Sequence, residues 1–415
     1  MWLLLLMIFI MPFETNPYLK ISDSFLGVFQ DFTVIKLLGM IGFGWAVARV
    51  LQGGDDEGLF GSRQAKLFLA LYAGILFAGL LSGSGFLVIS RYLAFMLFMP
   101  FVLASIRTHD DLRRVIYALA LTFVVVFPYA LRQMYRYGAR LGTGVSETNY
   151  FAANLVLVIP IAFAIALTQV DPMKRKLWFS GGLVLCLALF LTSSRGGFLG
   201  LLVAGVAYAY RRRGLMGAVT VLTILVLAVL PTGIGERTIA SITGTAHETP
   251  GLEQSNRAHT GLLKAGFRMV ADAPITGVGP QNFKALSLKY APELDRAFIA
   301  HNTYLELAAE TGIPVLVLFL LLLWQVYRTF NRATQLRGSP EARELATLAE
   351  GLRCGLLGFV VSASFISAQY EKLFWVTVFV SIAVERAVSR YERRVAEQAT
   401  VPDPLAFTPA GAPAR

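Results

Sequence analysis

Residues 148–168, TNYFAANLVLVIPIAFAIALT, form a stretch without a single charged side chain. An α-helix needs about 20 apolar residues to cross the hydrocarbon core of a bilayer, because each residue rises only about 1.5 Å. An open strand cannot span lipid, since its edge amides would have no hydrogen-bond partner. This stretch therefore predicts a transmembrane helix.

Similar apolar runs make up most of the chain. The 415 residues are 56% hydrophobic and only 15% charged, which is too apolar for an ordinary soluble protein. Residues 1–13 are short and lack the basic start and cleavage site of a signal peptide, so we interpret them as a first span. The other runs occupy residues 32–51, 64–82, 86–106, 113–131, 176–194, 196–210, 215–231, 312–327, 352–370 and 373–388. We predict an all-α polytopic membrane protein with about 12 transmembrane helices, or 11 if residues 1–13 do not cross.

Basic residues predict the orientation, because lysine and arginine are enriched in cytoplasmic loops. With the amino terminus inside, one side of the membrane collects the clusters Arg49 to Lys66, Arg107 to Arg114, Lys174 to Lys176, Arg211 to Arg213, Arg328 to Arg343 and Arg386 to Arg394. The net charge of +11 thus reflects topology, and no nucleic-acid partner is expected. Residues 232–300, which we call the polar segment, are then expected to form a periplasmic loop.

The predicted organisation has four parts. They are nine spans in residues 1–231, the polar segment, three spans in residues 301–390 and a cytoplasmic tail at 391–415. The tail is rich in Pro and Ala toward its end, cannot build a core and is expected to be disordered. In the polar segment, residues 233–251 predict a mobile loop, and Ser255 or Asn256 caps an amphipathic helix that lies on the membrane surface.

Several basic residues lie on the outer side, where membrane insertion does not require them. Each could simply meet lipid phosphate, but together they predict a site for a multiply charged anion, because a guanidinium binds two phosphate oxygens at once. A lipid-linked diphosphate is the natural candidate. Arg132, Arg136 and Arg140 recur every four residues and would share one face of a continued helix. The others are Arg91, Arg195, Arg257, Lys264 and Arg268.

Arg195 lies in Thr192-Ser-Ser-Arg-Gly-Gly197, a turn between two spans. Its paired glycines let a ligand approach the backbone closely, or they serve the packing of two helices. The sequence leaves both interpretations open.

His301 begins the sequence HNTYLELAAETGIP, which leads into the next span. A lone histidine is more often structural, yet an imidazole beside a basic cluster suits removal of a proton from a sugar hydroxyl. Asn302, Tyr304 and Glu306 are possible supporting residues, as are Asn149 and Glu147, which is also the alternative base. No metal-ligand spacing, Walker loop or dinucleotide fingerprint occurs, so we expect neither a metal nor another cofactor.

These motifs resemble the O-antigen ligase and polymerase superfamily of bacterial membrane glycosyltransferases. The likeness is sharpest at Ser193–Gly197, where Gly197 replaces a commoner alanine, at Arg257 with Asp272–Gly279, and at His301–Pro314. A weaker block runs from Glu147 to Pro160.

The resemblance implies a C-type glycosyltransferase of the inner membrane with its active site facing the periplasm. Such an enzyme moves a glycan from undecaprenyl diphosphate to an acceptor, without a metal and with inversion at the anomeric carbon. In the ligase branch the acceptor is a lipid A-core sugar. By position, Arg195 and Arg257 would contact the diphosphate and His301 would lie near the attacking hydroxyl. Arg132, Arg136, Arg140, Lys264 and Arg268 join the expected donor site on the charge pattern alone.

Three alternatives remain beside the ligase. A glycan polymerase and a protein O-oligosaccharyltransferase share the same motifs and differ in the acceptor. A transporter could also display outer arginines, but transporters place charged residues and broken helices at mid-membrane, often in repeated halves. The predicted spans have almost no charge at their centres and the polar segment occurs once, which favours catalysis at the interface.

Overall fold

The computed structural model describes residues 1–13, 17–25, 29–53, 60–83, 86–138, 140–143, 148–243, 245 and 252–400. The first eight helices are α1 (Trp2–Ile10), α2 (Val34–Leu51), α3 (Arg63–Leu81), α4 (Phe86–Ser105), α5 (His109–Tyr137), α6 (Thr148–Thr168), α7 (Pro172–Leu191) and α8 (Arg195–Val229). They are followed by α9 (Gly233–Thr243), α10 (Leu252–Asp272), α11 (Phe283–Tyr290), α12 (Thr303–Thr311), α13 (Ile313–Ala333), α14 (Pro340–Ser362) and α15 (Lys372–Thr400). Short 3-10 turns occupy Met11–Phe13, Pro17–Leu19, Ala363–Phe365 and Ala368–Tyr370.

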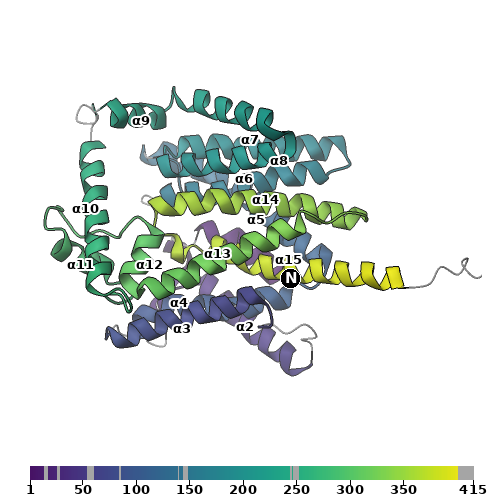
Figure 1. Ribbon diagram of the computed structural model, residues 1–415, viewed down its shortest axis with the longest axis horizontal. Helices are drawn as coiled ribbons and strands as arrows, with labels where there is room; N and C mark the ends of the chain where they lie inside the picture. The colour runs from purple at the N-terminus through teal and green to yellow at the C-terminus, as the bar shows by residue number, and fades with distance from the viewer. Residues whose placement is uncertain are drawn as a thin grey trace, which may run out of the picture.

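Each predicted apolar run contains a helix, although the run at 352–370 leaves α14 after Ser362 for two short 3-10 turns. The long helices lie side by side in a bundle (Figure 1). Among the described residues, 7 helices are long and apolar enough to cross a membrane. They are α2, α3, α5, α6, α8, α13 and α14. The predicted all-α polytopic class therefore agrees with the structure, while the number of 12 spans stays a prediction.

One small sheet was not predicted. Strands β1 (Lys20–Phe25) and β2 (Phe29–Thr33) pair antiparallel, with Lys20 opposite Thr33 and Phe25 opposite Phe29. Thr33 then caps α2, because its side chain accepts a hydrogen bond from the Lys36 amide at 3.5 Å. The hairpin thus ends where the second apolar run begins.

Helix α6 lies at the centre of the bundle against α14 and α8. Burial covers 78% of its apolar window, against 17% for α2, so α6 is a core helix and α2 faces lipid. Glycines permit this packing, since a Cβ at Gly355 would lie 2.1 Å from the Leu157 carbonyl oxygen and one at Gly358 would lie 2.5 Å from that of Gly200. The helices therefore meet backbone to backbone, as small residues allow in membranes.

Replacing Gly355 with alanine is expected to destabilise the fold by about 1 to 3 kcal/mol, because the added methyl group cannot fit without separating α14 from α6. The matched control is Gly44→Ala in α2, where an added Cβ meets no atom within 4 Å. Thermal unfolding of the purified variants measures the effect. Equal melting temperatures for the two variants would contradict the proposed packing.

Helix α8 consists of two halves. Gly214 has φ 62° and ψ −155°, so the helix breaks there and residues 215–229 form a separate stretch. A Cβ at Gly205 would lie 3.2 Å from the side chain of Val221, which shows that the second half folds back along the first. Leu222, Ile224 and Leu227 in this second half are exposed.

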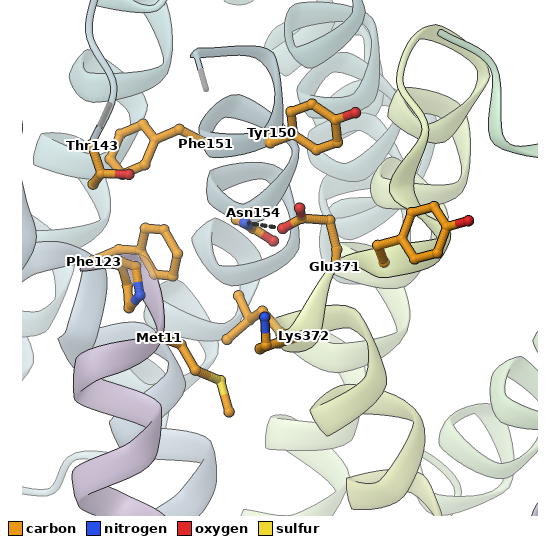
Figure 2. Close-up of a pocket in the computed structure, with 11 residues that line it drawn as sticks. Met11, Phe123, Thr143, Tyr150, Phe151, Asn154, Glu371 and Lys372 are labelled. Carbon is orange, nitrogen blue, oxygen red and sulfur yellow. Dashed lines mark hydrogen bonds between the residues drawn. The ribbon is translucent and has the colours of Figure 1, made fainter. Parts of the chain in front are cut away.

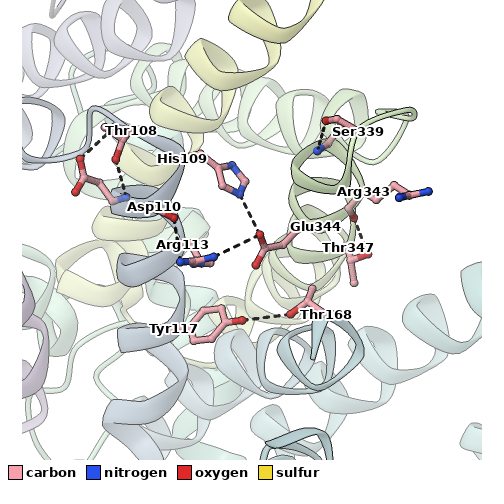
Figure 3. Close-up of polar contacts among 12 residues, drawn as sticks. Thr108, His109, Asp110, Arg113, Tyr117, Thr168, Ser339, Arg343, Glu344 and Thr347 are labelled. Atoms are coloured by element: carbon pink, nitrogen blue, oxygen red, sulfur yellow. Dashed lines mark hydrogen bonds and ion pairs between the residues drawn. The ribbon is translucent and has the colours of Figure 1, made fainter. Parts of the chain in front are cut away.

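Polar contacts join α5 and α14 at the end of the bundle that carries their first residues (Figure 3). His109 Nε2 lies 3.1 Å from Glu344 Oε2, and Arg113 lies 3.9 Å from the same carboxylate. Thr108 and Asp111 form a capping box that begins α5. These contacts fix the start of α5 against α14.

The polar segment is more ordered than predicted. Residues 233–243 form α9, so the prediction of a mobile loop from residue 233 is wrong there, and residues 244 and 246–251 lie outside the described residues. The predicted amphipathic helix exists as α10, which begins at Leu252 and runs across the ends of the long helices (Figure 1). Its buried face, Leu262, Ala265 and Met269, packs on Phe283 of α11.

The predicted start of the carboxyl-terminal tail, residue 391, was also too early in the chain. Helix α15 continues to Thr400, so residues 391–400 are helical and not disordered, while residues 401–415 lie outside the described residues. Arg332 of α13 forms an ion pair with Glu392, which ties this last part of α15 to the bundle.

Candidate functional site

A cavity of about 780 Å³ lies where the bundle meets the polar segment. It is enclosed by the turn before α8, the end of α8, the helices α9 and α10, the segment before α12 and the end of α14. Arg195 and His301 both line it, although 106 residues separate them in the sequence. The polar side chains that line it are Arg140, Asn149, Ser193, Ser194, Arg195, Thr238, His259, Thr260, His301, Asn302, Ser362 and Ser364.

The turn before α8 presents Arg195 to the cavity. Ser194 caps the helix, since its side-chain oxygen accepts a hydrogen bond from the Gly197 amide at 3.2 Å. Arg195 is therefore the first residue of α8, where the positive end of the helix dipole adds to its own charge. This end of α8 is suited to an anion.

The two glycines of this turn serve packing. A Cβ at Gly196 would lie 2.7 Å from the Phe365 Cβ, and one at Gly197 would lie 2.7 Å from the Ala152 Cβ. Both interpretations of the motif thus apply at once, because the glycines fit against α6 and the end of α14 while the arginine faces the cavity. The same contact with Ala152 explains why glycine, and not alanine, occupies position 197.

Arg140 reaches the cavity by a route that the sequence analysis did not predict. Helix α5 ends at Tyr137, and Gly138 adopts a left-handed conformation with φ 59°. Arg140 therefore turns back, donating from Nε to the Thr192 carbonyl at 2.7 Å and from Nη2 to Asn149 Oδ1 at 3.2 Å. The expected shared face with Arg132 and Arg136 is wrong.

The remaining basic candidates are placed elsewhere. Arg132 and Arg136 are exposed on α5 and do not line the cavity. On α10, Lys264 lies 3.9 Å from Glu293, and Arg268 donates to the Tyr290 carbonyl, so the structure does not bring these two to Arg195 either. The Arg257 side chain lies outside the described residues, although its backbone belongs to α10. The side chain of Arg91 and all of Glu147 also lie outside them.

His301 has a histidine partner in the cavity. Its ring and that of His259 on α10 are 5.8 Å apart between centroids and inclined at 61°. Burial, with a smaller contribution from His259, lowers the pKa of His301 to about 4. Burial also lowers the pKa of His259, with a further contribution from the charge of Arg195. Both imidazoles are therefore neutral at pH 7 and can accept a hydrogen bond from a hydroxyl group.

His259 was not among the residues predicted for the site, although the sequence contains a signal for it. His259 and Leu263 are one turn apart on α10, and both line the cavity. Placing His259 on the same face as the apolar Leu262 and Leu263 would have pointed it at the protein and away from water.

The residues after His301 hold its turn in place. Asn302 caps α12, since its Oδ1 accepts from the amides of Tyr304 at 3.1 Å and Leu305 at 3.0 Å, and it also lines the cavity. Tyr304 donates its hydroxyl to the Val360 carbonyl at 2.7 Å. Glu306 is buried and accepts hydrogen bonds from the Ala300 amide, Gln369 and Ser367. Tyr304 and Glu306 thus brace His301, which adopts a left-handed φ of 50°.

Two glycines join the segment after α10 to the end of α12. A Cβ at Gly277 would lie 2.2 Å from the Glu310 carbonyl carbon, and one at Gly312 would lie 2.1 Å from the Ile275 oxygen. The Ile313 amide donates to the Pro274 carbonyl at 2.8 Å across this contact. Pro314 lies in the first turn of α13, a position where proline is well tolerated.

A smaller cavity of about 100 Å³ lies on another face of α6 (Figure 2). Asn154 donates to Glu371 there at 2.8 Å, and Tyr150 and Lys372 also line it. Within the described residues, none of the predicted site residues lines this cavity.

Comparison with known proteins adds a family match. Residues 180–320 match the family model described as O-antigen ligase, and no curated protein matches the chain. The matched region contains the turn at Arg195, the polar segment and His301. Residues 180–320, about a third of the chain, are therefore similar to the O-antigen ligase family, and together with the helical membrane fold this match supports a glycosyltransferase-like enzyme of that superfamily.

Proposed function

We propose that this protein is an inverting glycosyltransferase that moves a glycan from undecaprenyl diphosphate to a lipid A-core sugar at the periplasmic face, without a metal. The supporting observation is a single cavity that holds Arg140, Arg195 and the neutral imidazoles of His259 and His301. Such a cavity offers cations for a diphosphate and an acceptor for a hydroxyl proton, which are the two requirements of this reaction.

The cations stabilise the leaving group. As the bond between the anomeric carbon and the diphosphate oxygen breaks, negative charge builds up on the diphosphate. Arg195 at the start of α8 is held in place before the reaction, so it meets this charge without rearrangement of solvent. Arg140, fixed by the Thr192 carbonyl and Asn149, adds a second guanidinium to the same cavity. Arg257 joins this site by its position in the family motif.

The imidazole of His301 guides the acceptor. The acceptor oxygen forms a new bond to the anomeric carbon on the face opposite the diphosphate, which inverts the configuration. With a pKa of about 4, His301 is a weak base. It therefore orients the hydroxyl through a hydrogen bond and takes the proton late, when bonding to carbon has made the oxygen acidic.

The apolar part of the cavity suits a lipid-linked donor. Phe198, Val229, Ile234, Leu263 and Phe365 line it beside the polar groups. A polyprenyl chain can contact these side chains and continue into the bilayer, while the diphosphate stays near Arg195. Membrane lipids surround the same entrance.

Neutralising Arg140 is expected to raise the KM for the donor by roughly tenfold, because a charge-assisted contact to phosphate is lost. Arg136→Gln is the matched control, since Arg136 is an exposed arginine only four residues away. Steady-state transfer kinetics with varied donor concentration measure the difference. Equal effects of the two substitutions would remove Arg140 from the site.

Reconstitution tests the reaction itself. The purified protein in liposomes receives an undecaprenyl-linked glycan and one of three acceptors, which are lipid A core, free glycan and a serine-containing peptide, each with and without a chelator. Transfer to the lipid A core in both conditions is the expected result. Transfer to glycan or peptide would assign the polymerase or the protein-glycosylating branch, and loss of transfer with the chelator would contradict metal independence.

A further inference from the structure

A second basic pocket lies at the opposite end of the bundle, and the function proposed above does not use it. It has a volume of about 520 Å³ and lies between α3, α13 and α15. Arg63 is the first residue of α3, and Arg328 lies near the end of α13. Helix α13 begins beside the His301 segment, and its 21 residues correspond to a rise of about 31 Å, the thickness of the hydrocarbon core. The pocket and the catalytic cavity therefore face opposite leaflets.

The charges in this pocket are not balanced within the protein. Neither Arg63 nor Arg328 has a hydrogen-bond or ion-pair partner among the described residues, and both line the pocket. The third arginine, Arg332, is already paired with Glu392. Glu385 also lines the pocket, and its Oε2 is buried without a partner in the described part of the chain. Two unpaired cations and one unsatisfied carboxylate thus converge.

Aromatic residues place the pocket at the depth of lipid headgroups. Trp324 on α13 is 57% exposed and stacks on Tyr327 at 5.7 Å, one turn from Arg328. Tryptophan and tyrosine gather at membrane interfaces, where one part of the ring is apolar and the other polar. The membrane-spanning helix α3 begins at this pocket, and α13 ends at it.

We propose that this pocket binds the headgroup of a phospholipid that carries both a phosphate and a primary ammonium group. Arg63 and Arg328 hold the phosphate, because two guanidiniums that form no ion pair with described residues favour an anion between them. Glu385 accepts a hydrogen bond from the ammonium. In the predicted orientation, the lipid belongs to the cytoplasmic leaflet. The enrichment of arginine on this side accounts for the number of cations, but not for their convergence on an unsatisfied carboxylate.

Inorganic phosphate and anionic lipids without nitrogen match the two arginines of this site but not its carboxylate. They can bind the arginines, but they leave Glu385 without a donor. A choline headgroup carries a quaternary ammonium that cannot donate a hydrogen bond. The proposed chemistry therefore ranks phosphatidylethanolamine above phosphatidylcholine, phosphatidylglycerol and free phosphate.

Native mass spectrometry of the delipidated full chain, with each of these four ligands added in turn, tests the ranking. We expect phosphatidylethanolamine to bind most tightly to the native protein. The double variant R63Q/R328Q should lose roughly tenfold or more of this affinity, since two charge-assisted contacts disappear. E385Q should keep phosphate binding but lose the preference for ethanolamine over choline. Arg343→Gln, an exposed arginine of α14 that does not line the pocket, is the control.

The results of these measurements distinguish binding of the lipid from binding of free phosphate. Unchanged phosphatidylethanolamine affinity in R63Q/R328Q would overturn the proposal. Binding of inorganic phosphate at the affinity of the lipid would overturn it too, because the pocket would then hold a free anion. E385Q retains both arginines, so it tests the ammonium contact even if the double variant fails to fold. None of these residues lines the catalytic cavity, so the result is independent of the proposed transfer reaction.

Discussion

Replacing Arg195 with glutamine is expected to lower the rate of glycan transfer by roughly a hundredfold to a thousandfold, which is the usual loss when one preorganised donor to a developing anion is removed. Arg195 already lines the cavity from the first turn of α8, so the backbone does not have to move to bring its guanidinium to the diphosphate. The measurement is transfer by the reconstituted variant at saturating donor and acceptor, so that kcat is read separately from KM.

Arg195→Lys distinguishes charge from geometry. A lysine keeps the positive charge but loses the planar fork, so it should recover only part of the rate. Arg132→Gln serves as the control for removing an exposed arginine. Thermal unfolding should be nearly unchanged in the glutamine variant, since the Ser194 cap that begins α8 remains. Full activity of Arg195→Gln in a folded protein would exclude Arg195 from the reaction.

Replacing His301 with alanine is expected to lower kcat by roughly a hundredfold to ten-thousandfold, the range of a lost proton acceptor. His301→Gln should lie between alanine and the native residue, because an amide can orient the hydroxyl but cannot take its proton. His109→Gln, at the opposite end of α5 from Arg140, controls for removing a histidine. If the variants His301→Ala and His301→Gln were both as active as the native enzyme, His301 would have only a structural role.

The pH profile gives an independent reading of His301. The kcat/KM profile reports the free enzyme, in which the pKa of His301 is about 4. This group should therefore cause no loss of activity from pH 8 to about pH 5, and a loss below that as the imidazole becomes charged. An unperturbed histidine, with a pKa of 6.5, would instead show its inflection near pH 6.5.

The same lowered pKa affects folding stability. The folded state favours neutral His301, so its contribution to stability is complete above pH 6.5 and is lost as the pH falls toward 4. Unfolding measured between pH 7 and pH 4 should therefore show a larger acid destabilisation in the native protein than in His301→Gln.

The sequence was sufficient where local pattern determines structure. The uncharged run of α6, the cap at Ser194 and the start of α12 after Asn302 each depend on residues within a few positions of one another. Arg195 and His301 could be nominated as partners because the positive-inside pattern places both on one side of the membrane. Their shared cavity depended in addition on packing, since Arg132 and Arg136 were expected on the same side and do not line it.

The placement of Arg140 and His259 depended on the path of the backbone, which the local sequence pattern did not determine. The periodicity of Arg132, Arg136 and Arg140 suggested one helix face, but Gly138 ends α5 and sends Arg140 toward Thr192 instead. Glycine after the last helical residue is a common terminator, and that signal should have outweighed the spacing. His259 could not be paired with His301 from the sequence, because the angle at which α10 crosses the bundle follows from the packing of Met269 and Phe283.

The fold-back of α8 at Gly214 has a practical consequence for assays. The second half of this helix contributes Val229 to the cavity that holds Arg195 and His301, yet its Leu222, Ile224 and Leu227 are exposed. Acyl chains must supply their missing neighbours, so the surrounding bilayer supports a helix that contributes to the cavity. Turnover recorded in detergent micelles should accordingly fall below that in liposomes, and lipid thickness becomes a variable to control alongside pH and temperature.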